Sequence, residues 1–215
     1  MIFGDMCDFV QATLGLEDIT PLDETVLVKQ QINLGVIDLL SRTRCTVRCV
    51  DIHTLAGVNE YTLDHAILSL VDINDGLRRV PRDSTWSPSF TLIRSDILRI
   101  QPTPDVNGEL QVWAVKRPQP MSADTDSPGA ESFGAIPDEY QDAIISYALW
   151  KCADYSDDAT SQMGERYRVN YEGQDGRGGR LGQIKIMVNK RGTSRAPTRR
   201  VRGLRPVHSA SNWAG

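Results

Sequence analysis

Residue types that could carry catalysis or hold a metal ion are sparse in this chain of 215 residues. Its histidines are His53, His65 and His208, and none has a Cys, Asp or Glu neighbour at the spacing of a zinc motif such as H-E-x-x-H. No G-x-S-x-G pattern marks a hydrolase nucleophile. We therefore expect no catalytic residue, no metal ligand and no cofactor.

The cysteines also lack the spacing of a metal site. They are Cys7, Cys45, Cys49 and Cys152, and we expect buried, unreactive thiols. If residues 45–49 form a strand, Cys45 and Cys49 face the same side of it. The N-terminus shows no charged region followed by an apolar stretch, so we expect no export and no disulfides.

A glycine-rich stretch and several acidic and aromatic residues have structural interpretations. Residues 173–182 lack the G-K-[ST] ending of a phosphate loop and follow a helical pattern, which favours a flexible joint carrying Arg177 and Arg180. The acidic pairs 138–139 and 157–158 suit helix N-termini better than a metal site. Trp113 is expected in the core. Five tyrosines are expected in a seam between two helices: Tyr140, Tyr147, Tyr155, Tyr167 and Tyr171.

The C-terminal region is the strongest candidate for binding. From residue 165 onward the chain has 12 Lys and Arg against 3 Asp and Glu, whereas residues 1–164 have 12 against 25. Such segregation of charge indicates partners rather than a fold. Within residues 190–205 the cations are Lys190, Arg191, Arg195, Arg199, Arg200, Arg202 and Arg205.

This basic segment has three interpretations. It could be a solvated terminus, it could neutralise the phosphates of a nucleic acid, or it could dock into an acidic groove of another protein. Leu204, Pro206, Val207 and Trp213 lie among the cations. Apolar anchors suit a protein pocket, so we favour the third interpretation and keep nucleic-acid binding as the alternative.

Hydrophobic periodicity predicts an α+β fold: a helical bundle, a small antiparallel β-subdomain and an extended basic C-terminal arm. Helices are expected at about 5–14, 21–42, 137–156 and 158–172. About five strands are expected within residues 46–116, at 46–53, 66–73, 90–94, 97–100 and 110–115. Residues 118–135 read as a polar loop or flexible excursion, residues 181–188 as a helix or a strand, and the chain beyond Arg191 as extended. No apolar run approaches the ~18 residues of a membrane span.

Three phrases carry a resemblance to a known family. The first is DFVQATLGL at 8–16, followed by QINLGVIDLLSR at 31–42, and the second is AGVNEYTL at 56–63. The third, AIPDEYQDAIISYALWKCA at 135–153, is the most specific. Over most of residues 5–172 the sequence resembles the head-to-tail adaptor (connector) proteins of tailed bacteriophages.

The resemblance implies a virion structural protein without catalysis, found in the neck and, during assembly, in the host cytoplasm. It implies a homo-oligomeric ring, typically a dodecamer, that binds the portal protein and a downstream neck or tail protein and lines the channel for DNA. Residues 1–189 would form the adaptor domain and residues 190–215 the arm that docks on the portal. The implied portal-binding residues are Lys190, Arg191, Arg195, Arg199, Arg200, Arg202, Leu204, Arg205 and Trp213.

Overall fold

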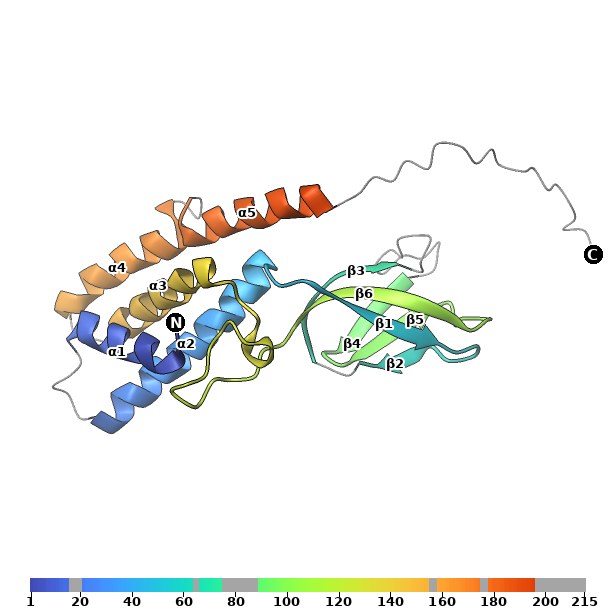
Figure 1. Cartoon of the computed structure of the whole chain (residues 1–215), viewed down its shortest axis with the longest axis horizontal. Helices are drawn as coiled ribbons and strands as arrows, with labels where there is room; N and C mark the ends of the chain where they lie inside the picture. Colours follow the sequence, from blue (N-terminus) through green and yellow to red (C-terminus); the bar gives the residue numbers. More distant parts are fainter. Residues whose placement is uncertain (16–20, 64–65, 75–88, 155–157, 175–177, 196–215) are drawn as a thin grey trace, which may run out of the picture.

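The computed structural model describes residues 1–15, 21–63, 66–74, 89–154, 158–174 and 178–195, which contain five α-helices and six strands. Figure 1 shows a helical part and a β part side by side, with the β part inserted between α2 and α3. The helices are α1 (Phe3–Leu14), α2 (Pro21–Thr43), α3 (Asp138–Asp154), α4 (Asp158–Glu172) and α5 (Arg180–Arg195). The strands are β1 (Arg48–Thr54), β2 (Glu60–Thr62), β3 (Ile67–Asn74), β4 (Ser89–Arg94), β5 (Ile97–Gln101) and β6 (Gly108–Lys116).

The first two helices follow their hydrophobic periodicity. α1 buries Met6, Val10 and Leu14, which recur every four residues, and it ends at Gly15, which adopts the left-handed conformation with φ of 65°. α2 begins at Pro21, where proline's fixed φ suits the first turn. It buries a stripe of apolar residues at helical spacing: Val28, Ile32, Val36, Leu39 and Leu40.

α3 is the central helix and contacts each of the other four. A Cβ added to Gly35 of α2 would lie 3.1 Å from Cδ1 of Tyr147, so this glycine lets α2 approach α3 closely. Tyr171 of α4 is fully buried, and its ring centroid is 5.4 Å from that of Tyr147. The predicted aromatic seam is confirmed for Tyr140, Tyr147, Tyr167 and Tyr171, which belong to one core; Tyr155 lies outside the described residues.

The expected small antiparallel β-subdomain consists of two three-stranded sheets, with six strands where we expected about five. One sheet has the order β1-β6-β3 and the other β2-β5-β4. Their buried side chains, among them Tyr61, Leu98 and Val112, form a second core separate from that of the helices. The missed strand is β2, which has three residues and no alternating pattern long enough to detect. The α+β class is confirmed.

The predicted core position of Trp113 is wrong. On β6 Leu110, Val112 and Ala114 are buried in alternation, which places Trp113 on the other face, where 38% of it is exposed; Val115 at the end of the strand is buried in the helical core. Cys49 pairs with Trp113 across the two strands and is also exposed. Cys45 precedes β1 and is half-buried, so the two thiols do not share a strand face.

Residues 118–135, which we call the strap, pack against the helices instead of forming a free excursion. The backbone N–H groups of Phe3 and Gly4 donate to the carbonyls of Asp126 (2.7 Å) and Asp124 (2.9 Å). Because no side chain caps α1, the strap supplies the acceptors that its first turn needs. The side-chain amide of Asn33 donates to the Met121 carbonyl (3.0 Å) and accepts from its N–H (2.8 Å). The backbone of the strap is therefore hydrogen-bonded to the helical part.

The chain does not become extended at residue 190 or 191. Residues 181–188, for which the sequence pattern allows either a helix or a strand, belong to α5, and this helix continues to Arg195. The boundary predicted between residues 189 and 190 therefore falls inside a helix. Residues 196–215, which we call the terminal peptide, lie outside the described residues.

Candidate functional site

The candidate functional site is α5 together with the glycine-rich joint that connects it to α4. Gly173 and Gly178 have φ values of 89° and 94°, a region that strongly favours glycine. A Cβ on Gly179 would overlap the Gly173 nitrogen and would lie 2.6 Å from the Tyr171 carbonyl oxygen. The end of α4 and the start of α5 can approach each other this closely only because residue 179 is a glycine. The joint thus directs α5 along the side of the bundle seen at the top of Figure 1.

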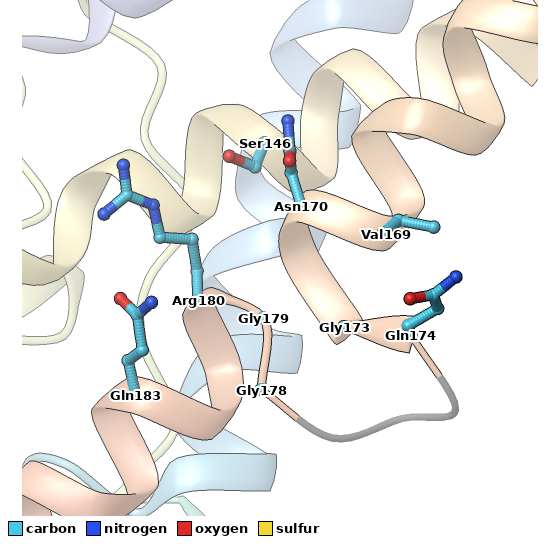
Figure 2. A pocket seen from close by; sticks show the side chains of 9 residues that line it. All are labelled: Ser146, Val169, Asn170, Gly173, Gln174, Gly178, Gly179, Arg180 and Gln183. Atoms are coloured by element: carbon cyan, nitrogen blue, oxygen red, sulfur yellow. The ribbon is translucent and has the colours of Figure 1, made fainter.

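A polar depression lies beside this joint (Figure 2). Its volume is about 570 Å³, and its lining residues come from α3, α4 and α5. The polar side chains around it are Ser146, Asn170, Gln174, Arg180 and Gln183. Arg180 is 3.7 Å from the Asp142 carboxylate, which leaves its charge partly balanced. These amide and hydroxyl groups can hydrogen-bond a polypeptide, and they include no nucleophile with an adjacent base.

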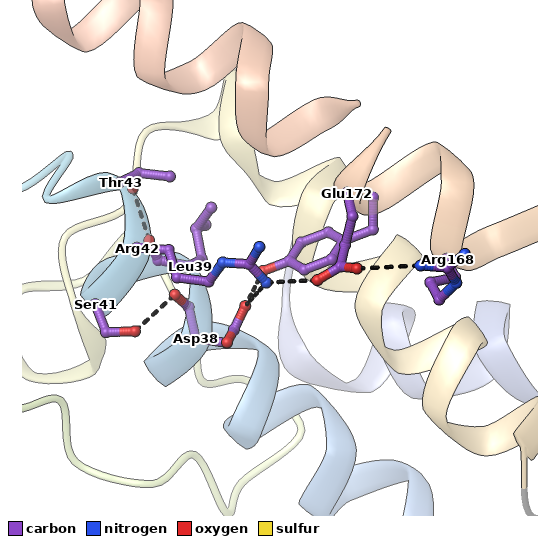
Figure 3. Close-up of polar contacts among 8 residues, drawn as sticks. Asp38, Leu39, Ser41, Arg42, Thr43, Arg168 and Glu172 are labelled. Carbon is purple, nitrogen blue, oxygen red and sulfur yellow. Dashed lines mark hydrogen bonds and ion pairs between the residues drawn. The ribbon is translucent and has the colours of Figure 1, made fainter. Parts of the chain in front are cut away.

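A polar network fixes α4 to α2 just before the joint (Figure 3). Arg42 lies 2.7 Å from Glu172 and 3.5 Å from Asp38, and Arg168 lies 3.5 Å from Glu172. The Tyr171 hydroxyl donates to Asp38 at 2.6 Å. Burial raises the pKa of Tyr171, and the hydrogen bond to Asp38 raises it further, so the hydroxyl keeps its proton and remains a donor. The network therefore holds the base of α5 in place.

α5 has one buried and one exposed face. Leu181 and Ile184 are buried in the helical core. Ile186 and Met187 are exposed over 56% and 37% of their surface. The helix has five Lys or Arg and no Asp or Glu. It therefore presents apolar side chains within a basic surface, a composition suited to contact with another macromolecule.

Two comparisons with known proteins bear on the nature of this surface. No curated protein sequence matches the chain. A family model described as SU10 adaptor protein matches residues 1–202, which include both parts of the fold and α5. The chain belongs to the SU10 adaptor protein family. The resemblance to phage head-to-tail adaptors is thereby confirmed.

An SU10 adaptor protein is a structural component of a phage that interacts with other head or tail proteins. None of the described helices of this adaptor is long and apolar enough to cross a membrane. Among the described residues, no group of three or more His, Cys, Asp or Glu could hold a metal ion. His53 is exposed and lies 3.5 Å from Glu109 on the β part, whereas His65 and His208 lie outside the described residues.

The structure describes the adaptor's first three predicted portal-binding residues, all of them on α5. Lys190 is exposed on α5, and Arg191 and Arg195 lie on the same helical backbone. The residues outside the described part are Arg199, Arg200, Arg202, Leu204, Arg205 and Trp213. Sequence reasoning missed Ile186 and Met187. Their signal was their position three and four residues after Gln183, on the face opposite Leu181 and Ile184.

The adaptor's thiols divide into two groups. Burial raises the pKa of Cys7 to about 11 and that of Cys152 to about 12, which confirms the prediction of buried thiols for these two residues. The prediction is wrong for Cys49, which is exposed. Slight burial is the larger cause that raises the pKa of the Cys49 thiol, and the neighbouring Asp51 carboxylate raises it further. Little of this thiol is therefore ionised at neutral pH.

Proposed function

We propose that this adaptor assembles into a ring, typically a dodecamer, that joins the portal vertex to the tail or neck. DNA passes through the ring without sequence-specific binding. The observation that carries the proposal is the family match over residues 1–202, which includes the basic helix α5 and the beginning of the terminal peptide. The neck of the virion is the proposed location.

We assign portal binding to the terminal peptide. Since α5 is helical through Arg195, an extended peptide can begin only after it, so Lys190, Arg191 and Arg195 lead into the contact rather than forming its centre. The proposed anchors are Arg199, Arg200, Arg202, Leu204, Arg205 and Trp213. Arginines fit carboxylates on the portal, while the leucine and tryptophan fit apolar pockets.

The test is co-assembly of the full chain with its portal protein, followed by native mass measurement and two-dimensional class averages. We expect a symmetric complex for the unmodified adaptor. Deletion of residues 196–215 should abolish portal binding while leaving the circular dichroism spectrum of the helices intact. Portal binding that survives this deletion would contradict the assignment.

A second candidate, nucleic-acid binding by the terminal peptide, is favoured by its arginines. The two functions differ in the role of the apolar residues. Leu204→Ala with Trp213→Ala should weaken portal binding at least tenfold, whereas binding to duplex DNA should depend on salt and on the arginines. DNA binding that falls steeply with salt, together with portal binding unaffected by the alanine pair, would favour the second candidate.

A further inference from the structure

The outward face of α1 carries acidic and apolar side chains in one stripe. Its residues follow the spacing i, i+3, i+4, i+7 and lie opposite the buried Met6 and Val10. Phe9 at its centre is 51% exposed. α1 has two aspartates and no Lys or Arg. This acidic stripe consists of Asp5, Asp8, Phe9 and Ala12.

The outward face of α5 carries a stripe with the same spacing and the opposite charge. It lies opposite Leu181 and Ile184, and its apolar members are Ile186 and Met187. Lys190 is in the stripe and Lys185 lies beside it, both exposed. This basic stripe consists of Gln183, Ile186, Met187 and Lys190.

The two stripes of one copy point away from each other. α1 packs against α2 and α3, whereas α5 packs against α2, α3 and α4. In Figure 1 the two helices lie on opposite sides of α3. Each stripe is the face that its helix turns away from the shared core, so the two cannot meet within one molecule.

We propose that the acidic stripe of one copy packs against the basic stripe of the next copy in the ring. Phe9 then lies against Ile186 and Met187, and Asp5 and Asp8 lie near Lys190 and Lys185. The contact joins two different surfaces, and a head-to-tail contact of this kind produces a ring when the rotation closes. The inference rests on the proposed ring and assigns its subunit interface.

Charge complementarity identifies a second copy as the occupant. All the charged residues of α1 are acidic, and all the charged residues of α5 are basic. The same division runs through the chain, with an excess of 13 acidic residues in 1–164 and of 9 basic residues in 165–215. The acidic segment 1–164 of one copy is therefore electrostatically complementary to the basic segment 165–215 of another.

Charge reversal with rescue tests the pairing. Asp5→Lys with Asp8→Lys, or Lys185→Glu with Lys190→Glu, should each raise the concentration needed for ring formation on the portal at least tenfold. All four changes in one chain should restore assembly. The matched control is Asp105→Lys with Glu109→Lys on the β part, where both residues are exposed; it should assemble normally. Unchanged assembly in both reversals, or no recovery in the combined variant, would overturn the interface.

Cross-linking distinguishes this inference from the proposed function. In a Cys49→Ser background, Phe9→Cys with Ile186→Cys and a short bis-maleimide should give a ladder of covalent multimers, whereas each single variant gives at most dimers. Rings on the portal without a ladder would overturn the interface and leave the proposed function standing. A cross-link from Ile186→Cys to the portal would assign α5 to the portal instead. Failure of the unmodified adaptor to form rings would overturn both.

Discussion

The bond between Tyr171 and Asp38 joins two helices that are distant in the sequence. The Tyr171 ring is fully buried against Tyr147, and its hydroxyl reaches a carboxylate that also lies 3.5 Å from Arg42. A partly buried polar pair of this kind is favourable only when both groups are satisfied. The pair therefore specifies how α4 sits on α2, and with it the direction in which α5 departs.

Tyr171→Phe keeps the ring and removes the hydroxyl. We expect the free energy of unfolding to fall by about 1–2 kcal/mol, because Asp38 loses a donor while it retains Arg42. Urea denaturation measures the change. Tyr167→Phe, at a half-buried tyrosine of the same helix, is the control and should cost less. Equal stability of the Tyr171→Phe variant and the unmodified protein would contradict this role.

The buried thiols predict a pH dependence of stability. Cys7 and Cys152 have pKa values of about 11 and about 12 in the folded protein, against an ordinary value of 9.0. The unfolded chain therefore loses these protons first. The contribution of the neutral thiols to the free energy of unfolding is complete below pH 9. It is lost as the pH rises from 9 to about 11 for Cys7 and from 9 to about 12 for Cys152, by up to about 1.4 kcal/mol per pH unit for each thiol.

Urea denaturation of the unmodified protein and of a Cys7→Ala, Cys152→Ala variant, repeated between pH 7 and pH 11, measures this dependence. The variant should be less stable at pH 7 because the substitutions leave small cavities. Its stability should nevertheless fall less steeply above pH 9. Parallel curves for the two proteins would show that the thiols titrate alike in both states.

Individual burial was only partly predictable from the sequence. Met6, Val10 and Leu14 repeat at the helical period, so their burial could be predicted. Trp113 is expected in the core because a tryptophan on a strand is most often buried, although alternation with Leu110, Val112 and Ala114 puts it on the opposite face of its strand. Alternation was the better guide than residue type at this position.

At the scale of elements, the glycine joint determines where α5 lies. Gly173 and Gly178 have positive φ, and Gly179 packs against the last turn of α4. The stretch that interrupts the hydrophobic pattern is thus a close contact between two helix ends. Such contacts tolerate no side chain, because the nearby atoms belong to the backbone and cannot rotate away.

Gly179→Ala places a Cβ within 2.6 Å of the Tyr171 carbonyl oxygen. We expect a loss of about 2–3 kcal/mol in the free energy of unfolding and a displacement of α5. Hydrogen exchange should show lower protection in α5 than in α3. Gly129→Ala is the control, because its nearest neighbours would lie at 3.5–3.6 Å, an ordinary contact distance. Normal protection of α5 in the Gly179→Ala variant would contradict the steric role of the joint.

Elements with a strong period were predictable and those without one were not. The range 158–172 for α4 agrees with the structure, because an acidic start and four-residue spacing mark it. The strap carries no period, since its order comes from bonds to Phe3, Gly4 and Asn33 in distant helices. The pattern left residues 181–188 open as a helix or a strand, because glycines interrupt it before α5 and five cations obscure the apolar positions of this helix.

At the scale of the whole molecule, the β part is an insertion whose ends lie together. Arg48, at the start of β1, is the cross-strand partner of Ala114, near the end of β6. The two cores have no buried residue in common; Val115 of β6 belongs to the helical core, and Leu68 and Val71 of β3 pack against it. Because all other buried residues of the helical core lie outside the strands, we expect the helical part to fold without the β part.

Replacement of residues 48–114 by a short Gly-Ser linker tests this independence. We expect the helical content and a cooperative thermal transition to survive, because the linker joins two positions that are already adjacent. Circular dichroism and thermal denaturation provide the measurement. A variant with molten or absent helical structure would show that the two parts fold as one unit.

The site was less predictable than the fold. The sequence indicated a basic C-terminal segment and a phage adaptor, and the family match confirms the second point. The exposed face of α1 follows from the period of its buried residues, whereas that of α5 could not be found beforehand, because the pattern left residues 181–188 open as a helix or a strand. Ile186 and Met187 can be assigned to the outward face of α5 only when Leu181 and Ile184 are known to face the core.

The paired connections to the β part have a mechanical consequence. Residues 44–47 lead into β1, and the chain leaves the β part after Lys116 of β6, the strand paired with β1; beside this exit the Arg117 N–H donates to the Ala66 carbonyl (2.8 Å). A body held by a single tether can swivel about it. A body held at two neighbouring points resists torque, so twist applied to the distal sheets would be passed on to α2 and the strap.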